Sequence, residues 1–143
     1  MPTVLFLCTG NYYRSRFAEI AFNALAEEHG SPWRADSRGL RINSFNFGPL
    51  SRHAAQALEL LDIPLPAERY PLAVTEKDLL AAQHVVAVKE AEHRELLAAS
   101  FPDWVERVEF WHIDDLDFAE PEEAIPILHE HVRKLFERLS VTR

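Results

Sequence analysis

One stretch near the start of the chain holds residue types that suit nucleophilic chemistry on a phosphoryl group. The only cysteine, Cys8, directly follows the apolar run 4–7, and Arg14 and Ser15 stand six and seven positions further on. A cysteine at the end of a buried strand is well placed to reach a ligand. Its thiolate can attack phosphorus, and a guanidinium fork can hold phosphoryl oxygens by two parallel hydrogen bonds. The spacing therefore predicts a phosphate-cleaving cysteine.

The residues between Cys8 and Arg14 suit a loop that turns its backbone N–H groups toward one anion. Because the ordinary pKa of a cysteine thiol is ~8.5, a thiolate nucleophile needs electropositive surroundings. Inward-facing amides and the N-terminus of a following helix stabilise an anion, and they hold phosphate for the same reason. Gly10 and Asn11 tolerate the left-handed backbone that such a loop requires. The expected substrate-binding residues of the loop are Thr9, Gly10, Asn11, Tyr12, Tyr13 and Ser15.

The sequence after the loop favours a helix. Apolar residues recur there at helical spacing: Phe17, Ile20, Ala21, Ala24 and Leu25. This spacing is typical of an amphipathic helix, so strand, loop and helix follow one another in the expected order. The alternative is that Cys8 is only a small buried side chain, which is the commoner fate of a free cysteine.

The octet 8–15 resembles the loop of the low-molecular-weight protein tyrosine phosphatases, Cys-x-Gly-Asn-x-Cys-Arg-Ser-Pro. The resemblance continues outside the loop and covers most of the chain, in Ala18-Glu19, Asp36-Ser37-Arg38-Gly39, Phe45 and Gly48. It implies that Cys8 is the nucleophile and that Arg14 binds the phosphoryl group. It also implies that Ser15 hydrogen-bonds the leaving thiolate, that Asn11 braces the loop and that Phe45 belongs to the pocket wall.

Three positions in and just after the loop depart from the family pattern, and Leu116 stands where the family has proline in a later Asp-Pro pair. Tyr13 replaces the second loop cysteine, so a protective disulfide with Cys8 cannot form and peroxide is expected to oxidise the thiol further. Arg16 stands where proline usually begins the helix, and Tyr12 replaces a smaller residue of the pocket wall. In relatives, threonine at this wall position goes with phosphoarginine and an aliphatic residue with phosphotyrosine. Tyr12 matches neither, so phosphotyrosine, phosphoarginine and a small phosphomonoester all stay open as substrates.

A leaving group such as a phenolate needs a proton, which a carboxylic acid usually supplies. Asp114, Asp115 and Asp117 follow the strand-like run 107–112, whose carboxyl end would meet that of the first strand in a parallel sheet. The family places an Asp-Pro pair here, and Asp115 is in register with its aspartate. We therefore expect Asp115 to be the acid, although an acidic surface loop is the alternative. His112 could tune this acid, but capping of the strand is the preferred reading.

Composition favours one small cytoplasmic domain. The chain has 143 residues, 48% of them hydrophobic, which suffices for a single core spanning residues 1–143. With one cysteine, no leader-like segment and no long apolar run, secretion and membrane insertion are not expected. The formal net charge of −8 disfavours nucleic acid as a partner. We expect a phosphorylated protein or small phosphomonoester as the partner, and a monomer or weak dimer.

Short apolar runs alternate with helical stripes, which predicts an α/β fold with a four-stranded parallel sheet and helices on both faces. Strands are expected at Thr3–Cys8, Arg34–Ser37, His84–Val88 and Arg107–His112. Helices are expected at Ser15–His29, Ser51–Leu61, Lys89–Ala99 and about Pro126–Leu139. Helix-end signals are Gly30 after the first helix, Ser51 as an N-cap, Pro64 as a stop and a capping box at Thr75-Glu76-Lys77-Asp78.

Side chains around the expected site suggest its charge and shape. A positive pocket is expected from Arg14, Arg16, Arg38 and Arg41. Loop aromatics that could stack on a substrate ring, or simply plug the edge of the core, are Tyr12, Tyr13, Phe45, Phe47 and Phe118. No metal and no cofactor is expected, because the two histidines of His129-Glu130-His131 lack the i, i+4 spacing of ligands on one helix face.

The expected activity is that of a phosphatase that hydrolyses phosphomonoesters, protein phosphotyrosine first, through a cysteinyl-phosphate intermediate. Two alternatives remain open from the sequence. An arsenate reductase on this scaffold would need an external thiol, because the chain has no further cysteine. A phosphate-binding module without efficient catalysis is suggested by Tyr13, Arg16 and Leu116.

Overall fold

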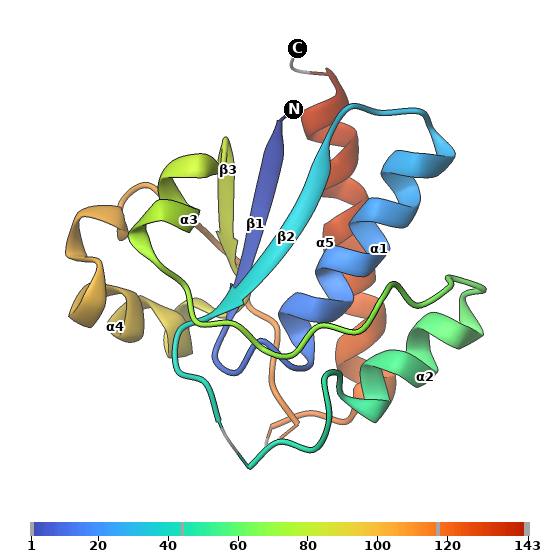
Figure 1. Ribbon diagram of the computed structural model, residues 1–143, viewed down its shortest axis with the longest axis horizontal. Coiled ribbons are helices and arrows are strands. Elements are labelled where there is room, and N and C mark those ends of the chain that lie inside the picture. The colour runs from blue at the N-terminus through green and yellow to red at the C-terminus, as the bar shows by residue number, and fades with distance from the viewer. Residues whose placement is uncertain (1, 44, 117, 142–143) are drawn as a thin grey trace.

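Four parallel strands form one sheet in the order β2-β1-β3-β4 (Figure 1). The strands are β1 (Thr3–Cys8), β2 (Arg34–Gly39), β3 (His84–Ala87) and β4 (Glu109–Phe110). The structure is a computed structural model, and it describes residues 2–43, 45–116 and 118–141. The predicted α/β fold with a four-stranded parallel sheet is confirmed.

Helices cover both faces of the sheet, as predicted. One face packs against α1 (Arg14–Glu28), α2 (Arg52–Leu60) and α5 (Pro121–Val141), and the other against α3 (Glu76–Ala81), α4 (Glu90–Ser100) and the 3₁₀ turn η1 (Pro102–Trp104). The central strand β1 shows why: Val4 and Phe6 join the first core, while Leu5 and Leu7 join the second. A strand buried on both faces reads as a continuous apolar run, as residues 4–7 do.

Local signals in the sequence mark three helix ends. Gly30 has φ +63° after α1, and the Ser51 side chain accepts from the His53 amide at the start of α2. The capping box of Thr75 and Asp78 begins α3. All three signals were predicted.

Two helix ends and one strand differ from expectation. The helix α2 ends at Leu60, one residue before the expected Leu61 and ahead of the predicted stop at Pro64; Asp62 there adopts φ +58° and the Ile63 amide donates back to Leu58 O at 2.9 Å. The helix α5 begins at Pro121, and Pro126 lies inside it. The strand β4 is shorter than the expected run 107–112, since it lies at the sheet edge and pairs only with β3. No helix among the described residues has the length and apolar character needed to cross a membrane.

The carboxyl ends of the strands meet at one edge of the sheet, at the lower side of Figure 1. Here the loop after β1 leans on the end of β2, with the amides of Leu40 and Arg41 donating to Cys8 O (2.9 Å) and Thr9 O (2.8 Å). Gly39 makes this close approach possible. A Cβ at Gly39 would lie 2.8 Å from Thr9 O and 2.6 Å from Ile42 Cδ1.

We predict that Gly39→Ala destabilises the protein by about 3 kcal/mol, because the added methyl group forces apart two backbone segments that are fixed by hydrogen bonds. Urea unfolding measures the loss. Gly30→Ala is the control: it places alanine at φ +63° with no atom within 4 Å of the new Cβ, and should lose about 1 kcal/mol. An equal or smaller loss for Gly39→Ala would contradict the packing argument.

Candidate active site

Cys8 ends β1 and is 2% exposed, at the base of a cavity of about 280 Å³. The cavity is lined by Cys8, Thr9, Gly10, Tyr12, Tyr13, Arg14, Arg41, Asn43, Asn46, Asp115 and Leu116. Cys8 Sγ lies 2.9 Å from Ser15 Oγ. Since Asn11 Nδ2 already donates to Ser15 Oγ at 2.9 Å, the hydroxyl hydrogen is free to donate to the sulfur.

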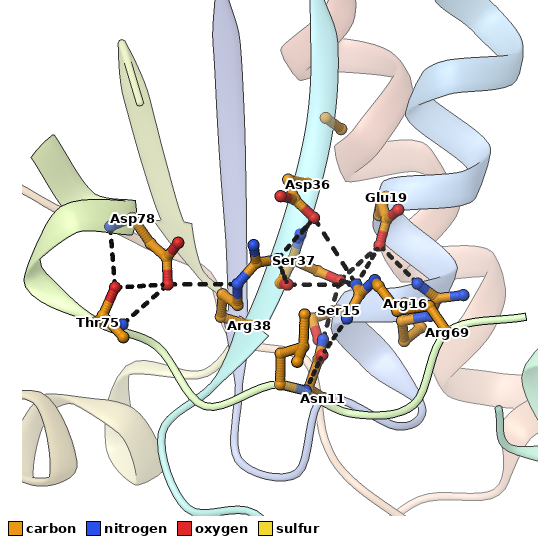
Figure 2. Close-up of polar contacts among 12 residues, drawn as sticks. Asn11, Ser15, Arg16, Glu19, Asp36, Ser37, Arg38, Arg69, Thr75 and Asp78 are labelled. Carbon is orange, nitrogen blue, oxygen red and sulfur yellow. Dashed lines mark hydrogen bonds and ion pairs between the residues drawn. The ribbon is translucent and has the colours of Figure 1, made fainter. Parts of the chain in front are cut away.

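Asn11 is part of the loop and braces it through its side chain (Figure 2). Its backbone is left-handed, with φ +51°, and its side chain is fully buried. Its Nδ2 donates to Ser15 and to Ser37 Oγ (2.9 Å), while its Oδ1 accepts from Arg69 Nη1 (3.1 Å) and the Leu72 amide (3.0 Å). These four hydrogen bonds hold a backbone conformation that few residues adopt, as expected for Asn11. Gly10 does not use a positive φ; a Cβ there would lie 3.3 Å from Asn46 Nδ2.

Arg69 connects Asn11 to the helix that follows the loop (Figure 2). It lies in the connection between α2 and α3, and its Nη2 donates to Glu19 Oε1 (3.1 Å) and Ser37 Oγ (3.0 Å). Glu19 also accepts from Ser37 Oγ at 2.6 Å and from Arg16 Nη1 at 3.1 Å. The same carboxylate thus joins α1, β2 and a long connection behind the loop.

Arg14 is 2% exposed and is held in position by three acceptors. Its Nη1 donates to Ile113 O (2.9 Å) and Glu92 Oε1 (3.2 Å), and its Nη2 to Glu92 Oε2 (2.8 Å). Asp115 Oδ2 lies 3.4 Å from Nη2. Among the described residues, nothing accepts from Nε, which leaves that edge for a ligand. Burial opposes the charge, but Cys8, Glu92 and Asp115 outweigh it and raise the pKa of Arg14 above its ordinary value.

Glu92 stands at the start of α4 and carries the ion pair with Arg14. Its carboxylate also accepts from the Thr9 hydroxyl and lies 3.2 Å from His93 Nε2. His93 is fully buried, and its Nδ1 accepts from the Lys89 amide at 3.1 Å, so Nε2 carries the proton. Burial acts to raise the pKa of Glu92, but hydrogen bonds from His93, Arg14 and Thr9 outweigh it and hold that pKa well below its ordinary range.

Of the three candidate acids, the structure brings Asp115 into the cavity with Cys8 and Arg14. The Leu116 amide donates to Asp115 Oδ1 at 2.9 Å, which turns Oδ2 toward Arg14. Asp114 instead pairs with Lys89 Nζ at 2.7 Å. Asp117 lies outside the described residues. His112 bridges to Lys89 in an isolated antiparallel pair of backbone segments.

The prediction that four arginines form a positive pocket is wrong for two of them. Arg14 and Arg41 line the cavity, but Arg16 is 3% exposed and pairs with Glu19 behind the loop. Arg38 pairs with Asp36 and Asp78 (Figure 2). Both side chains leave the site because their elements, α1 and β2, present them to carboxylates on the far side of the loop.

Two of the five loop aromatics line the cavity, and the other three are exposed on the surface. Tyr12 and Tyr13 line the cavity, and Tyr12 donates to Phe47 O. Phe45, Phe47 and Phe118 lie outside the cavity lining and are 91%, 91% and 72% exposed. A contact between Phe45 and substrate therefore stays a prediction. Asn11 and Ser15 do not line the cavity either; they support it from behind. Within the described ranges, no group of three or more His, Cys, Asp or Glu side chains is arranged to hold a metal ion.

Sequence reasoning missed Glu92, His93 and Arg69. The first two had a usable signal, because they lie in the first turn of the helix that follows β3 and so come near the same sheet edge as Cys8. Arg69 had none, since it lies in an irregular connection whose path depends on tertiary contacts.

Known proteins similar to this chain share one fold. The family model described as low molecular weight phosphotyrosine protein phosphatase matches residues 3–142. The chain is 30% identical over 105 residues to the protein-arginine-phosphatase of Bacillus subtilis (strain 168), covering 73% of this chain and 67% of that protein. A crystal structure of a YwlE mutant from Bacillus subtilis has a TM-score of 0.81 at 26% identity, covering 97% of this chain and 99% of the other. A low molecular weight protein tyrosine phosphatase from T. tengcongensis has a TM-score of 0.78 at 26% identity, with both chains fully covered.

We predict that Glu92→Gln destabilises the protein by about 2 kcal/mol at pH 7, because it leaves Arg14 buried without its counter-charge. A carboxyl whose pKa is lowered by folding contributes stability above its unfolded pKa of about 4.3, and loses it as the pH falls. The difference between wild type and variant should therefore shrink as the pH falls below about 4.5.

Chemical unfolding at pH 7 and pH 4 measures this difference. Glu90→Gln is the matched control on the same helix, since Glu90 pairs with Arg94 at the surface, with side chains 38% and 42% exposed. It should change stability by less than about 0.5 kcal/mol. A Glu92→Gln deficit that is absent at pH 7, or that grows on acidification, would refute the assignment.

Proposed function

The chain belongs to the low molecular weight phosphotyrosine protein phosphatase family and is a cysteine-based phosphatase, and we propose that Cys8, Arg14 and Asp115 carry out its reaction. One observation carries the proposal: the three side chains line the same cavity of about 280 Å³ at the carboxyl edge of the sheet. A nucleophile, a phosphoryl-binding cation and a proton donor are the groups that phosphomonoester cleavage through a covalent intermediate needs.

In the first step, the Cys8 sulfur forms a bond to phosphorus while the bond from phosphorus to the leaving oxygen breaks. The leaving oxygen takes the proton of the Asp115 carboxyl. Arg14 and the amides of the loop bear the charge on the remaining phosphoryl oxygens. Glu92 and Ile113 accept from Nη1 and Nη2 of Arg14, whereas nothing among the described residues accepts from its Nε, and this supports the role.

In the second step, water attacks the cysteinyl phosphate and gives its proton to the Asp115 carboxylate. The bond from sulfur to phosphorus breaks, and inorganic phosphate leaves. The Ser15 hydroxyl, 2.9 Å from Cys8 Sγ, stabilises the thiolate that departs. Because a thiolate nucleophile must stay reduced, this mechanism suits a reducing compartment, and we propose the cytoplasm.

We predict that Cys8→Ser abolishes hydrolysis of p-nitrophenyl phosphate and that Asp115→Asn lowers kcat by about 100-fold, because the leaving oxygen loses its acid. Asp114→Asn is the matched control; Asp114 pairs with Lys89 rather than facing the cavity, so the rate should hold within about twofold. Full activity of Cys8→Ser would refute the nucleophile. If Asp115→Asn kept its rate, the acid would have to be sought at Asp114 or Asp117.

For the substrate we propose a phosphorylated phenol, with protein phosphotyrosine first. Tyr12, Tyr13 and Leu116 line the cavity and suit contact with a ring. Arg41 lines it too, and no carboxylate pairs with it among the described residues. Its charge attracts a phosphate dianion but repels the guanidinium of phosphoarginine. Phosphoarginine is the second candidate, favoured by the likeness to the protein-arginine-phosphatase of Bacillus subtilis.

We predict that a peptide carrying phosphotyrosine has a kcat/KM at least about tenfold above that of the same peptide carrying phosphoarginine, which corresponds to about 1.4 kcal/mol. Arg41→Ala should narrow this ratio by about threefold, because it removes the repulsion. Phosphate release from both peptides measures the ratio. A preference for phosphoarginine that Arg41→Ala leaves unchanged would overturn the substrate assignment while leaving the phosphatase chemistry in place.

A further inference from the structure

Tyr13 carries a buried hydroxyl group that has no hydrogen-bond partner in the part of the chain that the structure describes. The residue is 5% exposed and lines the catalytic cavity together with Cys8, Arg14 and Asp115. A buried polar group without a partner costs stability, and phenylalanine of the same shape would avoid that cost. Such a group in the wall of an active site is therefore a candidate for a function that appears only when substrate is bound.

The surroundings of Tyr13 favour the protonated phenol, whose hydroxyl has no acceptor among the residues that the structure describes. Its ring meets the His53 ring edge-on, with centroids 6.4 Å apart. The charged groups that act on the phenol are Asp115, Arg14 and Glu122. Burial first, and then the negative charge of Asp115, raise the pKa of Tyr13 to about 12. The phenol thus keeps its proton at every pH at which the enzyme would work.

Asp115 needs a new partner once substrate binds. Its Oδ1 accepts from the Leu116 amide, and its Oδ2 faces Arg14 Nη2 at 3.4 Å. A bound phosphoryl group carries negative oxygens that compete with Asp115 for the same guanidinium. As Asp115 gives its proton to the leaving oxygen, it becomes a carboxylate whose cation is shared with the phosphoryl group. A neutral donor in the cavity wall would stabilise that carboxylate without binding the phosphate.

We propose that the Tyr13 hydroxyl is a positioning residue for Asp115 and donates a hydrogen bond to the carboxylate that forms as Asp115 protonates the leaving group. This inference rests on the proposed role of Asp115 as the acid. It assigns a task to the residue that replaces the second loop cysteine of the family pattern, and it explains why a hydroxyl without a partner is retained in a buried site.

The variant Tyr13→Phe tests the proposal when its activity is compared on two substrates whose leaving groups differ in their need for a proton. Hydrolysis of phenyl phosphate, whose phenolate needs a proton, should lose about tenfold in kcat/KM. Hydrolysis of 2,4-dinitrophenyl phosphate, whose leaving group departs without one, should change by less than about twofold. The melting temperature of the variant should stay the same or rise by about 3 °C, because an unsatisfied hydroxyl is removed. Tyr70→Phe is the control, since Tyr70 is 63% exposed and should change neither rate nor melting temperature.

A double-mutant cycle separates the inference about Tyr13 from the proposal that Asp115 is the acid. In the Asp115→Asn background, Tyr13→Phe should cause no further loss on phenyl phosphate, because the two groups act as a unit. A full additional loss would mean that the hydroxyl acts on the substrate directly, and would overturn the proposal. So would an equal loss on both substrates with a lowered melting temperature, which is the mark of a structural role.

The two proposals fail in different ways. If Asp115→Asn keeps the wild-type rate on phenyl phosphate, the acid is misassigned and Tyr13 loses its partner. If Asp115→Asn slows that reaction and Tyr13→Phe does not, the acid stands and the inference about Tyr13 alone is wrong.

Discussion

The ion pair between Arg14 and Glu92 is the interaction on which the site depends. Arg14 is 2% exposed, and a guanidinium buried to that degree is stable only when its charge is paired and its N–H groups have acceptors. Glu92 and Ile113 O meet both needs on one edge of the fork. The same contacts tie the start of α1 to α4 and to the segment after β4. A ligand therefore meets a cation that is already fixed, and catalysis gains because little reorganisation is left to the reaction itself.

A second set of contacts fixes the loop from behind. Asn11 holds a left-handed backbone that would be strained elsewhere, and its amide group is fully engaged by Ser15, Ser37, Arg69 and the Leu72 amide. These partners come from α1, β2 and the connection between α2 and α3. Strain at a functional site persists only where the surrounding structure determines it in several ways. Here the elements at the sheet edge provide several such contacts. Figure 2 shows Ser15, Ser37 and Arg69 around Asn11.

The sequence predicts those parts of the site that depend on short range or on sheet geometry. Cys8 and Arg14 share one loop, and Asp115 follows a strand parallel to the first, so their meeting could be expected. The direction in which a side chain points could not be predicted from the sequence. Arg16 turns to Glu19 because it lies on the buried face of α1, and that face is fixed only by packing. The position of Arg69 is even harder to predict, because an irregular connection has no periodic sequence pattern that would indicate its path.

The departure at Leu116 shows how a missing motif residue can be replaced by another kind of constraint. A proline after the acid would restrict the backbone through its ring but would have no N–H to donate. Leu116 keeps its N–H, which donates to Asp115 Oδ1 at 2.9 Å and turns the other oxygen toward Arg14. The orientation of the proposed acid is then set by the hydrogen bond from the Leu116 amide to the Asp115 carboxyl group rather than by a fixed dihedral angle. Such a bond tolerates small rotations of the carboxyl group, so Asp115, if it is the acid we propose, depends more on its neighbours in the cavity wall than an aspartate restrained by a following proline would.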